Sequence, residues 1–376
     1  MNVTVNATAL GPQPTGLGVY TREVVRRLVA DGQLEGATIF AGRTDGLADD
    51  AHAQVVSWTS RHHGTLGHAE RILWLQTGFR GAVAQAVPGL VYSTVPEGII
   101  NLPRGAMQII TVHDIIPVHY PALYPASVQY YRHVLPRLLA HAAAVICNST
   151  CTRDDLVKWS GLKRLNTQVI AEGYDAATFR PDTADAAPPA VSGPYLLWVG
   201  DMRPYKNLQR VLEAFAAMRS PGLVLVVAGR LDPRYLPAVR EAMAQLGIAG
   251  AVALAGYVPD AELAGLYRHA TGLVFASLYE GFGLPPLEAM ASGCPVIASR
   301  AASLPEVCGD AALYVDPTDV SSIAAGMREL ASHQSLQDEL RSAGLARAQL
   351  FSWEQTARGI AAVLDRAAEQ AGGRSA

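Results

Sequence analysis

Two carboxylates eight positions apart are the clearest chemical feature of the sequence. Glu280 and Glu288 bracket the segment "YEGFGLPPLEAM" (279–290), which also contains two glycines and two prolines. Glycines before a helix let backbone amides approach a phosphate, and the positive end of the helix dipole attracts that anion. Carboxylates repel phosphate but accept hydrogen bonds from hydroxyl groups. The segment therefore predicts a ligand that carries a ribose, a diphosphate and a sugar.

The position of this segment strengthens the prediction. By itself, a pair of glutamates at this spacing is more often a turn cap and a surface residue. Here the pair follows the apolar run "GLVFASL" (272–278), a predicted strand, and open α/β sheets bind ligands at the carboxyl ends of their strands. Pro285 and Pro286 suit the first turn of a helix, where no amide hydrogen is needed. The amides expected to face the ligand are those around Gly283, Leu284 and Leu287.

Short apolar runs alternate with amphipathic segments in the second half of the chain. Runs that are apolar on both faces are typical of central strands in a parallel sheet. The helical segment "NLQRVLEAFAAM" places Leu208, Val211, Leu212 and Phe215 on one face. The pattern predicts a doubly wound α/β domain. The predicted strands are 195–200, 223–230, 251–258, 272–278, 294–299 and 311–316.

The first half alternates less clearly but follows the same pattern. A helix is predicted for "GVYTREVVRRLVA", after a glycine loop at 11–18, and another for "YYRHVLPRLLAHA", where Pro136 is expected to introduce a kink. A second α/β domain follows from this alternation. Its predicted strands are "MNVTVNA", "GATIFAG", "AQVVSW", "PGLVYST", "MQIITVHD", "AAVICNS" and "TQVIAEG".

A segment rich in Pro, Ala and Asp at 180–194 separates the halves and has the composition of an exposed linker. We therefore predict an N-terminal domain over residues 1–183 and a C-terminal domain over 184–355, facing each other across a cleft. A C-terminal helix over 356–376 is expected to return toward the N-terminal domain.

Composition excludes several classes of protein. The net charge is −3, with 15 Lys/Arg against 13 Asp/Glu in residues 1–180, so neither half predicts nucleic acid as a partner. No apolar run approaches the roughly 20 residues that cross a bilayer. The start "MNVTVNATAL" has no signal-peptide pattern, and the four cysteines match no metal or redox spacing. These features predict a cytoplasmic protein.

The segment "SLYEGFGLPPLEAMASGCPVIAS" resembles the donor-site signature of retaining glycosyltransferases of family 4, which have the GT-B fold. The resemblance extends through "YLLWVGDMRPYKNLQRVLEAF", "LPEVCGDAALYVDPTD" and "FSWEQTA". In the first half, "TGLGVYTREVVRRL", "TVHDIIPVHYPALYP" and "ICNSTCTRDDL" also look like this family. The resemblance therefore covers nearly the whole chain, and its motifs are more specific in the second half than in the first.

The resemblance implies roles for residues of the second half. Glu280 would contact the transferred sugar and Glu288 the ribose. Lys206 would contact the diphosphate and neutralise charge on the leaving group. Arg203 would assist it, although Asp201 stands where many relatives have arginine. The remaining implied donor contacts are Val258, Gly281, Phe282, Gly283 and Leu284.

In the first half, the resemblance places His113 close to the reacting sugar. Gly16 and Gly18 match a glycine loop that approaches the donor phosphates from the opposite domain. Asn148 is more typical of a structural position at a strand end. Glu172 replaces an asparagine common in relatives, and its role is left open.

The resemblance also implies a reaction. A hexose would move from a nucleotide diphosphate sugar to an acceptor hydroxyl with retention and without a metal or other cofactor. "HDIIPVHYPALYP" is similar to segments of bacterial mannosyltransferases, which favours GDP-mannose over a UDP-sugar. The acceptor would be a glycan or a lipid-linked intermediate of polysaccharide biosynthesis, such as lipopolysaccharide.

Three alternatives stay open at the level of the sequence. A nucleotide-sugar epimerase or hydrolase could use the same fold, and a two-domain sugar-binding protein could close on a free sugar. A third alternative concerns the basic residues around 132–137 and 158–164, which could rest on an anionic membrane at its inner face or form ordinary solvated helix faces.

Overall fold

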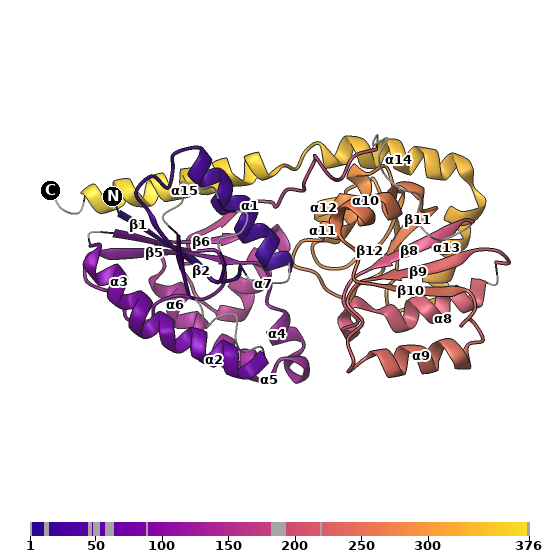
Figure 1. Cartoon of the computed structure of the whole chain (residues 1–376), viewed down its shortest axis with the longest axis horizontal. Helices are drawn as coiled ribbons and strands as arrows, with labels where there is room; N and C mark the ends of the chain where they lie inside the picture. The colour runs from indigo at the N-terminus through magenta and orange to yellow at the C-terminus, as the bar shows by residue number, and fades with distance from the viewer. Residues whose placement is uncertain are drawn as a thin grey trace. The chain divides into compact units, whose positions relative to one another are not determined.

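The computed structural model describes residues 2–10, 15–43, 47, 53–56, 64–87, 89–181, 193–218 and 220–373. The chain forms two compact units (Figure 1). Unit 1 consists of Met1–Gly173 and Trp353–Ala376, and unit 2 of Tyr174–Ser352. Most of the predicted linker, and residues 11–14 of the predicted glycine loop, lie outside the described residues.

Unit 1 is built on a seven-stranded sheet in which every paired strand is parallel, in the order β3-β2-β1-β4-β5-β6-β7. Two of its inner strands, β4 and β6, are buried along their whole length, which explains their nearly unbroken apolar sequences. Each predicted run overlaps one strand. The strands are β1 (Asn2–Ala7), β2 (Thr38–Ala41), β3 (Ala53–Val55), β4 (Gly89–Ser93), β5 (Ala106–Val112), β6 (Ala144–Cys147) and β7 (Thr167–Val169).

The helices of unit 1 cover this sheet (Figure 1). The segment with Pro136 is divided into two helices at Val134 rather than kinked, with Pro136 in the first turn of the second. The helices are α1 (Gly16–Ala30), α2 (Gly64–Trp74), the π-helix η1 (Leu75–Phe79), α3 (Arg80–Gln85), α4 (Ile116–His119), the 3-10 helix η2 (Pro121–Leu123), α5 (Pro125–His133), α6 (Leu135–His141), α7 (Thr150–Ser160) and α15 (Trp353–Gly373).

Unit 2 has a six-stranded sheet, also parallel in each pair, in the order β10-β9-β8-β11-β12-β13. Its strands are β8 (Tyr195–Val199), β9 (Val224–Ala228), β10 (Val252–Gly256), β11 (Gly272–Phe275), β12 (Val296–Ser299) and β13 (Leu313–Val315). Its helices are η3 (Pro204–Lys206), α8 (Leu208–Met218), α9 (Leu236–Gln245), α10 (Asp260–His269), α11 (Leu284–Ala291), α12 (Leu304–Cys308), α13 (Val320–Ser332) and α14 (Gln334–Ala348).

Alternation along β8 builds two hydrophobic clusters in unit 2. Tyr195 and Leu197 belong to one cluster, while Leu196 and Trp198 belong to the other. Successive side chains of a strand point to opposite faces, so the sheet is covered on both sides. The predicted apolar face of α8 is buried in the second cluster.

The boundaries of the units differ from those expected at 183/184 and 355/356. Residues 174–181 belong to unit 2, because Phe179 is buried in its core and its ring lies 6.0 Å from that of Tyr267. The C-terminal helix begins at Trp353, which is buried with its ring 6.0 Å from that of Tyr20 in unit 1.

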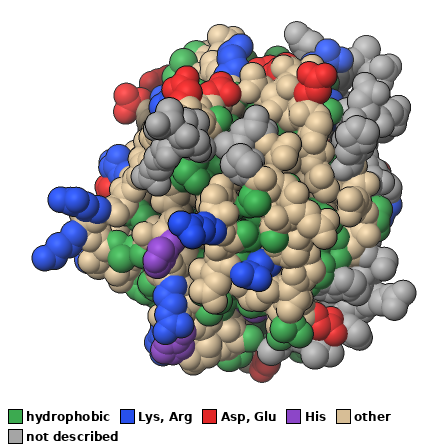
Figure 2. Space-filling model, turned by 90° about the vertical axis from the view of Figure 1, so that its left-hand side faces the viewer, with side chains coloured by type: hydrophobic (Ala, Val, Ile, Leu, Met, Phe, Trp, Pro, Cys, Tyr) green, Lys and Arg blue, Asp and Glu red, His purple; other side chains and the backbone are tan. Residues whose placement is uncertain are grey.

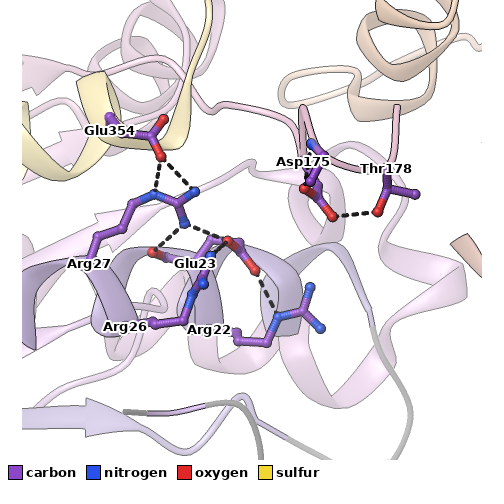
Figure 3. A network of polar contacts seen from close by, with 8 residues as sticks. Arg22, Glu23, Arg26, Arg27, Asp175, Thr178 and Glu354 are labelled. Atoms are coloured by element: carbon purple, nitrogen blue, oxygen red, sulfur yellow. Dashed lines mark hydrogen bonds and ion pairs between the residues drawn. The ribbon is translucent and has the colours of Figure 1, made fainter. Parts of the chain in front are cut away.

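A charged network joins the first and last helices of unit 1 (Figure 3). The buried carboxylate of Glu23 on α1 pairs with Arg22, Arg26 and Arg27, and Arg27 also pairs with Glu354 on α15. The C-terminal helix α15 is thereby attached to α1. Figure 3 also draws the Asp175–Thr178 hydrogen bond of 2.7 Å, which stabilises the first turn of unit 2.

Candidate active site

The candidate donor site of unit 2 lies where the strand order of its sheet reverses. Strand β8 pairs with β9 on one side and with β11 on the other, so the connections leave β8 and β11 in opposite directions. A crevice forms at the carboxyl ends of two such strands, and ligands of open α/β sheets bind there. The loop after β8 carries Arg203 and Lys206, and the loop after β11 carries Glu280.

The structure brings Lys206 and Glu280 together across this point. The Lys206 Nζ atom lies 2.8 Å from Oε1 and 2.9 Å from Oε2 of Glu280. The two side chains keep only 16% and 9% of their surface exposed. The ammonium group also lies 5.5 Å from the centre of the Phe275 ring. A cation and a carboxylate are thus held, largely desolvated, side by side.

Backbone contacts hold the two loops in this arrangement. Asn207, which has a left-handed φ of 64°, donates from Nδ2 to the carbonyl oxygens of Ala276 (2.8 Å) and Pro317 (2.7 Å). The Leu278 amide donates to the Tyr205 carbonyl at 2.7 Å. These hydrogen bonds join the two loops beside Lys206.

Ser303 fixes the turn that follows Glu280. Its hydroxyl lies 3.0 Å from the carbonyl oxygen of Glu280 and 2.6 Å from that of Phe282, and it can donate to either. Phe282 itself is buried, with its ring 5.9 Å from Phe351. Any contact of Phe282 with a ligand would therefore be made by its backbone. Gly281, between the two carbonyls, is buried as well.

Helix α11 begins as the sequence predicts, with Gly283 before its first residue, Leu284. Within the described chain, the amides of Gly283 and Leu284 donate to no backbone carbonyl. The Leu287 amide was expected to be free as well, but it donates to the Gly283 carbonyl at 3.4 Å. That expectation was wrong, because the first turn of the helix uses this hydrogen itself.

Glu288 lies half-buried on α11, where Tyr267 donates from its hydroxyl to Oε2 at 3.3 Å. Burial raises the pKa of Glu288 to about 8, and the charges of Asp260 and Asp175 act in the same direction. The Tyr267 hydrogen bond opposes this shift. At neutral pH the carboxyl group is therefore mainly protonated, and it can both donate to and accept from a hydroxyl.

Arg203 is more exposed than Lys206, with 36% of its side-chain surface accessible. Its Nε lies 3.3 Å from Oδ2 of Asp201, so the residue that departs from the family pattern is its ion-pair partner. Its Nη1 is 3.4 Å from the Tyr205 hydroxyl. Val258 lies two residues beyond β10 and packs, half-buried, against the same cluster as Leu284.

The two glycines predicted to form a loop in unit 1 instead occupy the first turn of α1. Thr15 caps this helix, and its hydroxyl accepts from the Gly18 amide at 3.2 Å. The helix therefore begins at Gly16, before the position expected from the sequence. A Cβ atom at Gly16 would meet nothing within 4 Å, whereas at Gly18 it would lie 3.4 Å from the Ala9 carbonyl oxygen.

His113 follows β5 and is 6% exposed in unit 1. Its Nδ1 lies 3.1 Å from Oε1 of Glu172, and its Nε2 lies 2.9 Å from the Thr94 carbonyl oxygen. Burial alone would lower the pKa of His113, but the hydrogen bond and charge of Glu172 outweigh it and raise the pKa above its ordinary value. The Tyr20 ring packs edge-on at 4.5 Å.

Sequence reasoning missed several residues that shape these two places. Ser303 and Asn207 organise the donor loops, and Tyr267 contacts Glu288. Glu172 was left without a role although it is the partner of His113. The signal available for Glu172 was its place just after the strand run "TQVI". Within the described residues, no group of three or more His, Cys, Asp or Glu side chains could hold a metal ion.

Two family profiles match the chain, one for each half. The profile of glycosyl transferases group 1 matches residues 181–347, and that of glycosyltransferase family 4 matches residues 14–178. The O-antigen chain mannosyltransferase B of Escherichia coli is 30% identical over 372 residues, covering 90% of this chain and 93% of that relative. The chain belongs to glycosyltransferase family 4.

Solved structures agree with this family 4 assignment at the level of the fold. Sucrose-phosphate synthase from Thermosynechococcus elongatus matches with a TM-score of 0.80 at 21% identity, over 97% of this chain and 98% of that one. Anabaena Alr3699/HepE in complex with UDP-glucose matches with a TM-score of 0.74 at 17% identity, over 97% and 100%. The two parallel sheets and these neighbours confirm the predicted GT-B fold class.

The family 4 chain is a glycosyltransferase, as the sequence predicted. In the part of the chain that the structure describes, none of the helices is both long and apolar enough to cross a membrane.

Proposed function

We propose that the enzyme transfers mannose from GDP-mannose to a hydroxyl of a glycan or lipid-linked acceptor in polysaccharide biosynthesis, with a UDP-sugar as the second choice of donor. The name of the Escherichia coli relative, an O-antigen chain mannosyltransferase, supports mannose and the polysaccharide. The complex of Alr3699/HepE with UDP-glucose supports a nucleotide diphosphate sugar as the class of donor.

The observation that carries this proposal is the Lys206–Glu280 pair at the carboxyl ends of β8 and β11. The Glu280 carboxylate would accept hydrogen bonds from the hydroxyls of the hexose. Lys206 would lie between that carboxylate and the diphosphate, and would neutralise charge as the phosphate departs. Arg203 would add positive charge at the same edge of the sheet.

The start of α11 would bind the rest of the donor. The amides of Gly283 and Leu284 suit a phosphate oxygen, and the helix dipole favours an anion there. Glu288 would hold the ribose, Gly281 and Phe282 would contribute backbone, and Val258 an apolar contact. With Lys206 and these amides supplying positive charge, the reaction needs no metal ion.

We propose retention of anomeric configuration by a front-face reaction in which the departing phosphate helps to deprotonate the acceptor. A double-displacement route needs a free carboxylate nucleophile at the anomeric carbon. Glu280 is bound to Lys206 and suits hydroxyl binding instead. The protein would contribute position and charge stabilisation. In unit 1, His113, Gly16 and Gly18 would approach the reacting sugar and phosphates, and other parts of this unit would bind the acceptor.

A peripheral contact with the inner face of the membrane belongs to the same proposal. Arg132, His133 and Arg137 are exposed at α5 and α6. Lys158, Lys163 and Arg164 are exposed at and after the end of α7, where Val157 keeps 39% of its surface. Figure 2 shows Lys, Arg and His side chains beside hydrophobic ones on one face of the protein. Flotation with anionic liposomes should carry the protein upward, and neutral liposomes should not; equal flotation would contradict this contact.

Donor identity is tested by thermal shift against GDP-, UDP-, ADP- and dTDP-sugars, followed by product analysis with a mannoside acceptor. GDP-mannose should give the largest shift and a product with the α linkage of the donor. Glu280→Ala should reduce transfer by about two or more orders of magnitude while the fold survives.

The matched control is Glu241→Ala, because Glu241 is an exposed carboxylate on α9 of the same unit. It should transfer at the wild-type rate. Near-wild-type turnover by Glu280→Ala would refute the role of that carboxylate. Release of free mannose at the same rate with and without acceptor would identify a hydrolase instead.

A further inference from the structure

The carboxyl ends of four neighbouring strands in unit 1 gather buried polar side chains. Thr94, His113 and Asn148 directly follow β4, β5 and β6, and Glu172 lies three residues beyond β7. All four are at most 6% exposed. Ligands of parallel α/β sheets bind at this edge, so these buried polar groups are candidates for contact with a ligand.

His113 has both ring nitrogens occupied within the protein. One faces the carboxylate of Glu172 and the other the carbonyl of Thr94, and neither partner group is a donor when Glu172 is ionised. A ring whose two nitrogens both face acceptors carries two protons and a positive charge. The other neighbours of this ring are Asp114, the next residue, and the edge-on ring of Tyr20. His113 therefore offers no ring nitrogen to a ligand in this state.

The unused hydrogen-bonding capacity of the cluster lies beside His113. Both hydrogen bonds of Glu172, from His113 and from Asn148 Nδ2 at 2.8 Å, end on Oε1. Within the described chain, no group donates to Glu172 Oε2. This oxygen is absent from the buried polar atoms that lack a partner, so it is accessible to solvent. Asn148 Oδ1 is buried and unpaired among the described residues. Two side chains joined by a hydrogen bond thus each keep one acceptor oxygen with free capacity.

We infer that Glu172 and Asn148 form a subsite for neighbouring hydroxyl groups of a hexosyl unit, and that His113 is the positioning residue that holds Glu172 in place. Two adjacent acceptors are complementary to two adjacent hydroxyl donors, which sugars have and phosphates lack. The inference rests on the proposed function. The hexosyl unit could belong to the donor or to the acceptor, and the experiment distinguishes the two.

The charge of His113 makes this arrangement physically reasonable. A carboxylate that is 5% exposed would be costly without a cation, and the imidazolium provides one at 3.1 Å. Against the effect of burial, the hydrogen bond and charge of Glu172 raise the pKa of His113, so the geometry and the charge of the ring agree. A hydrogen bond to a charged acceptor is stronger than one to a neutral acceptor.

The test compares Glu172→Gln with wild type and with Glu23→Gln. Glu23 is also 5% exposed and ion-paired in unit 1, so it reports the general effect of losing a buried carboxylate. Calorimetric titrations measure GDP-mannose and GDP binding, and steady-state assays measure KM for methyl α-mannoside. Glu172→Gln should weaken sugar binding roughly tenfold or more, while Glu23→Gln should not.

The two sources of the hexosyl unit give different results. If the subsite binds the donor sugar, GDP-mannose binding weakens while GDP binding stays constant. If it binds the acceptor, KM for methyl α-mannoside rises and GDP-mannose binding stays constant. Unchanged values for all three ligands would overturn the inference. If Glu172→Gln does not fold, Asn148→Ala should show a smaller loss in the same direction, and no loss would overturn the inference.

Two further measurements separate this inference from the proposed function. NMR titration of His113 should show its pKa lowered in Glu172→Gln whatever the substrate is, and an unchanged pKa would overturn the positioning role. If wild type binds no nucleotide sugar, the proposed function fails, and methyl α-mannoside binding by saturation-transfer NMR then decides the subsite. Binding that Glu172→Gln loses would support it, and no binding by wild type would overturn it.

Discussion

In the proposed donor site, Lys206 and Glu280 would bind a ligand while adding little to the stability of the fold. Desolvating two charges costs about as much as their attraction returns, so an apolar pair of similar volume is often equally stable. Removing one partner alone leaves the other charge buried without compensation. The pair is therefore explained better by the proposed binding of the donor than by a gain in stability.

This view predicts opposite results for single and double substitution. Lys206→Met should lower the free energy of unfolding by about 2–4 kcal/mol, because Glu280 then lacks its cation. Lys206→Met with Glu280→Leu should recover most of that stability in urea unfolding but no transferase activity. A double variant less stable than Lys206→Met would mean that the pair mainly holds the fold together.

Glu288 predicts a dependence of stability on pH. In the folded protein the Glu288 carboxyl keeps its proton up to about pH 8, whereas in the unfolded chain it loses the proton near its ordinary pKa of 4.5. The folded state therefore binds more protons between these values, and stability falls as the pH rises through this range. Glu288→Gln should be as stable as wild type near pH 4.5 and more stable at pH 8 by on the order of 3 kcal/mol.

Thermal unfolding of both proteins from pH 4.5 to 8 measures this difference. Glu241→Gln, at an exposed carboxylate on α9, should follow the wild-type curve at every pH. A constant offset between Glu288→Gln and wild type would show that Glu288 titrates alike in the folded and unfolded chain.

At the scale of elements, the start of α11 depends on one glycine. Gly283 has a φ of 120°, which L-residues rarely adopt, and an added Cβ would lie 2.8 Å from Leu304 Cδ2. Gly283→Ala should therefore lower the free energy of unfolding by about 2–3 kcal/mol and weaken donor binding, since it displaces the amides that begin the helix. Urea unfolding and nucleotide titration measure the two effects.

Gly222→Ala separates backbone strain from this clash. Gly222 has a φ of 80° and nothing within 4 Å of an added Cβ. Its substitution should cost about 1 kcal/mol and leave donor binding intact. Equal effects at both glycines would contradict a special role for the turn before α11.

Strands were the elements most accessible to sequence reasoning. Each expected run, from "MNVTVNA" to "AALYVD", overlaps one strand, and strands buried on both faces, such as β4, β6 and β8, have nearly unbroken apolar sequences. Local turn chemistry was less visible. Helix α1 begins where the Thr15 hydroxyl caps it, although Gly16 and Gly18 suggested a loop there. The Leu287 amide donates to the Gly283 carbonyl at the start of its own helix.

Contacts between distant segments were the hardest to predict. Lys206 and Glu280 were both named from the sequence, but their pairing depends on the adjacency of β8 and β11. The pairing of His113 with Glu172 depends in the same way on β5, β6 and β7 lying side by side. Such contacts follow from sheet order, and no local periodicity encodes them.

At the scale of the whole molecule, the chain passes from one unit to the other within three residues. Phe351 contacts Phe282 in unit 2, whereas Trp353 is buried against Tyr20 in unit 1. The boundary predicted at 183/184 lies ten residues earlier, because Tyr174 and Phe179 pack on the core of unit 2 although the residues around them have no apolar periodicity. Two aromatic residues close together in the sequence thus pack on different units, and composition alone does not reveal this boundary.

This passage predicts that two nearby substitutions destabilise different units. Trp353→Ala removes a fully buried indole from unit 1 and should cost about 3–5 kcal/mol. Hydrogen exchange read by mass spectrometry should then rise in α1 and α15 but not in α11. Phe351→Ala should raise exchange around Phe282 and α11 and leave α1 unchanged. If either substitution raised exchange equally in both units, the two units would unfold together as one cooperative body. Unit 2, the proposed donor-binding unit, would then not unfold independently of unit 1.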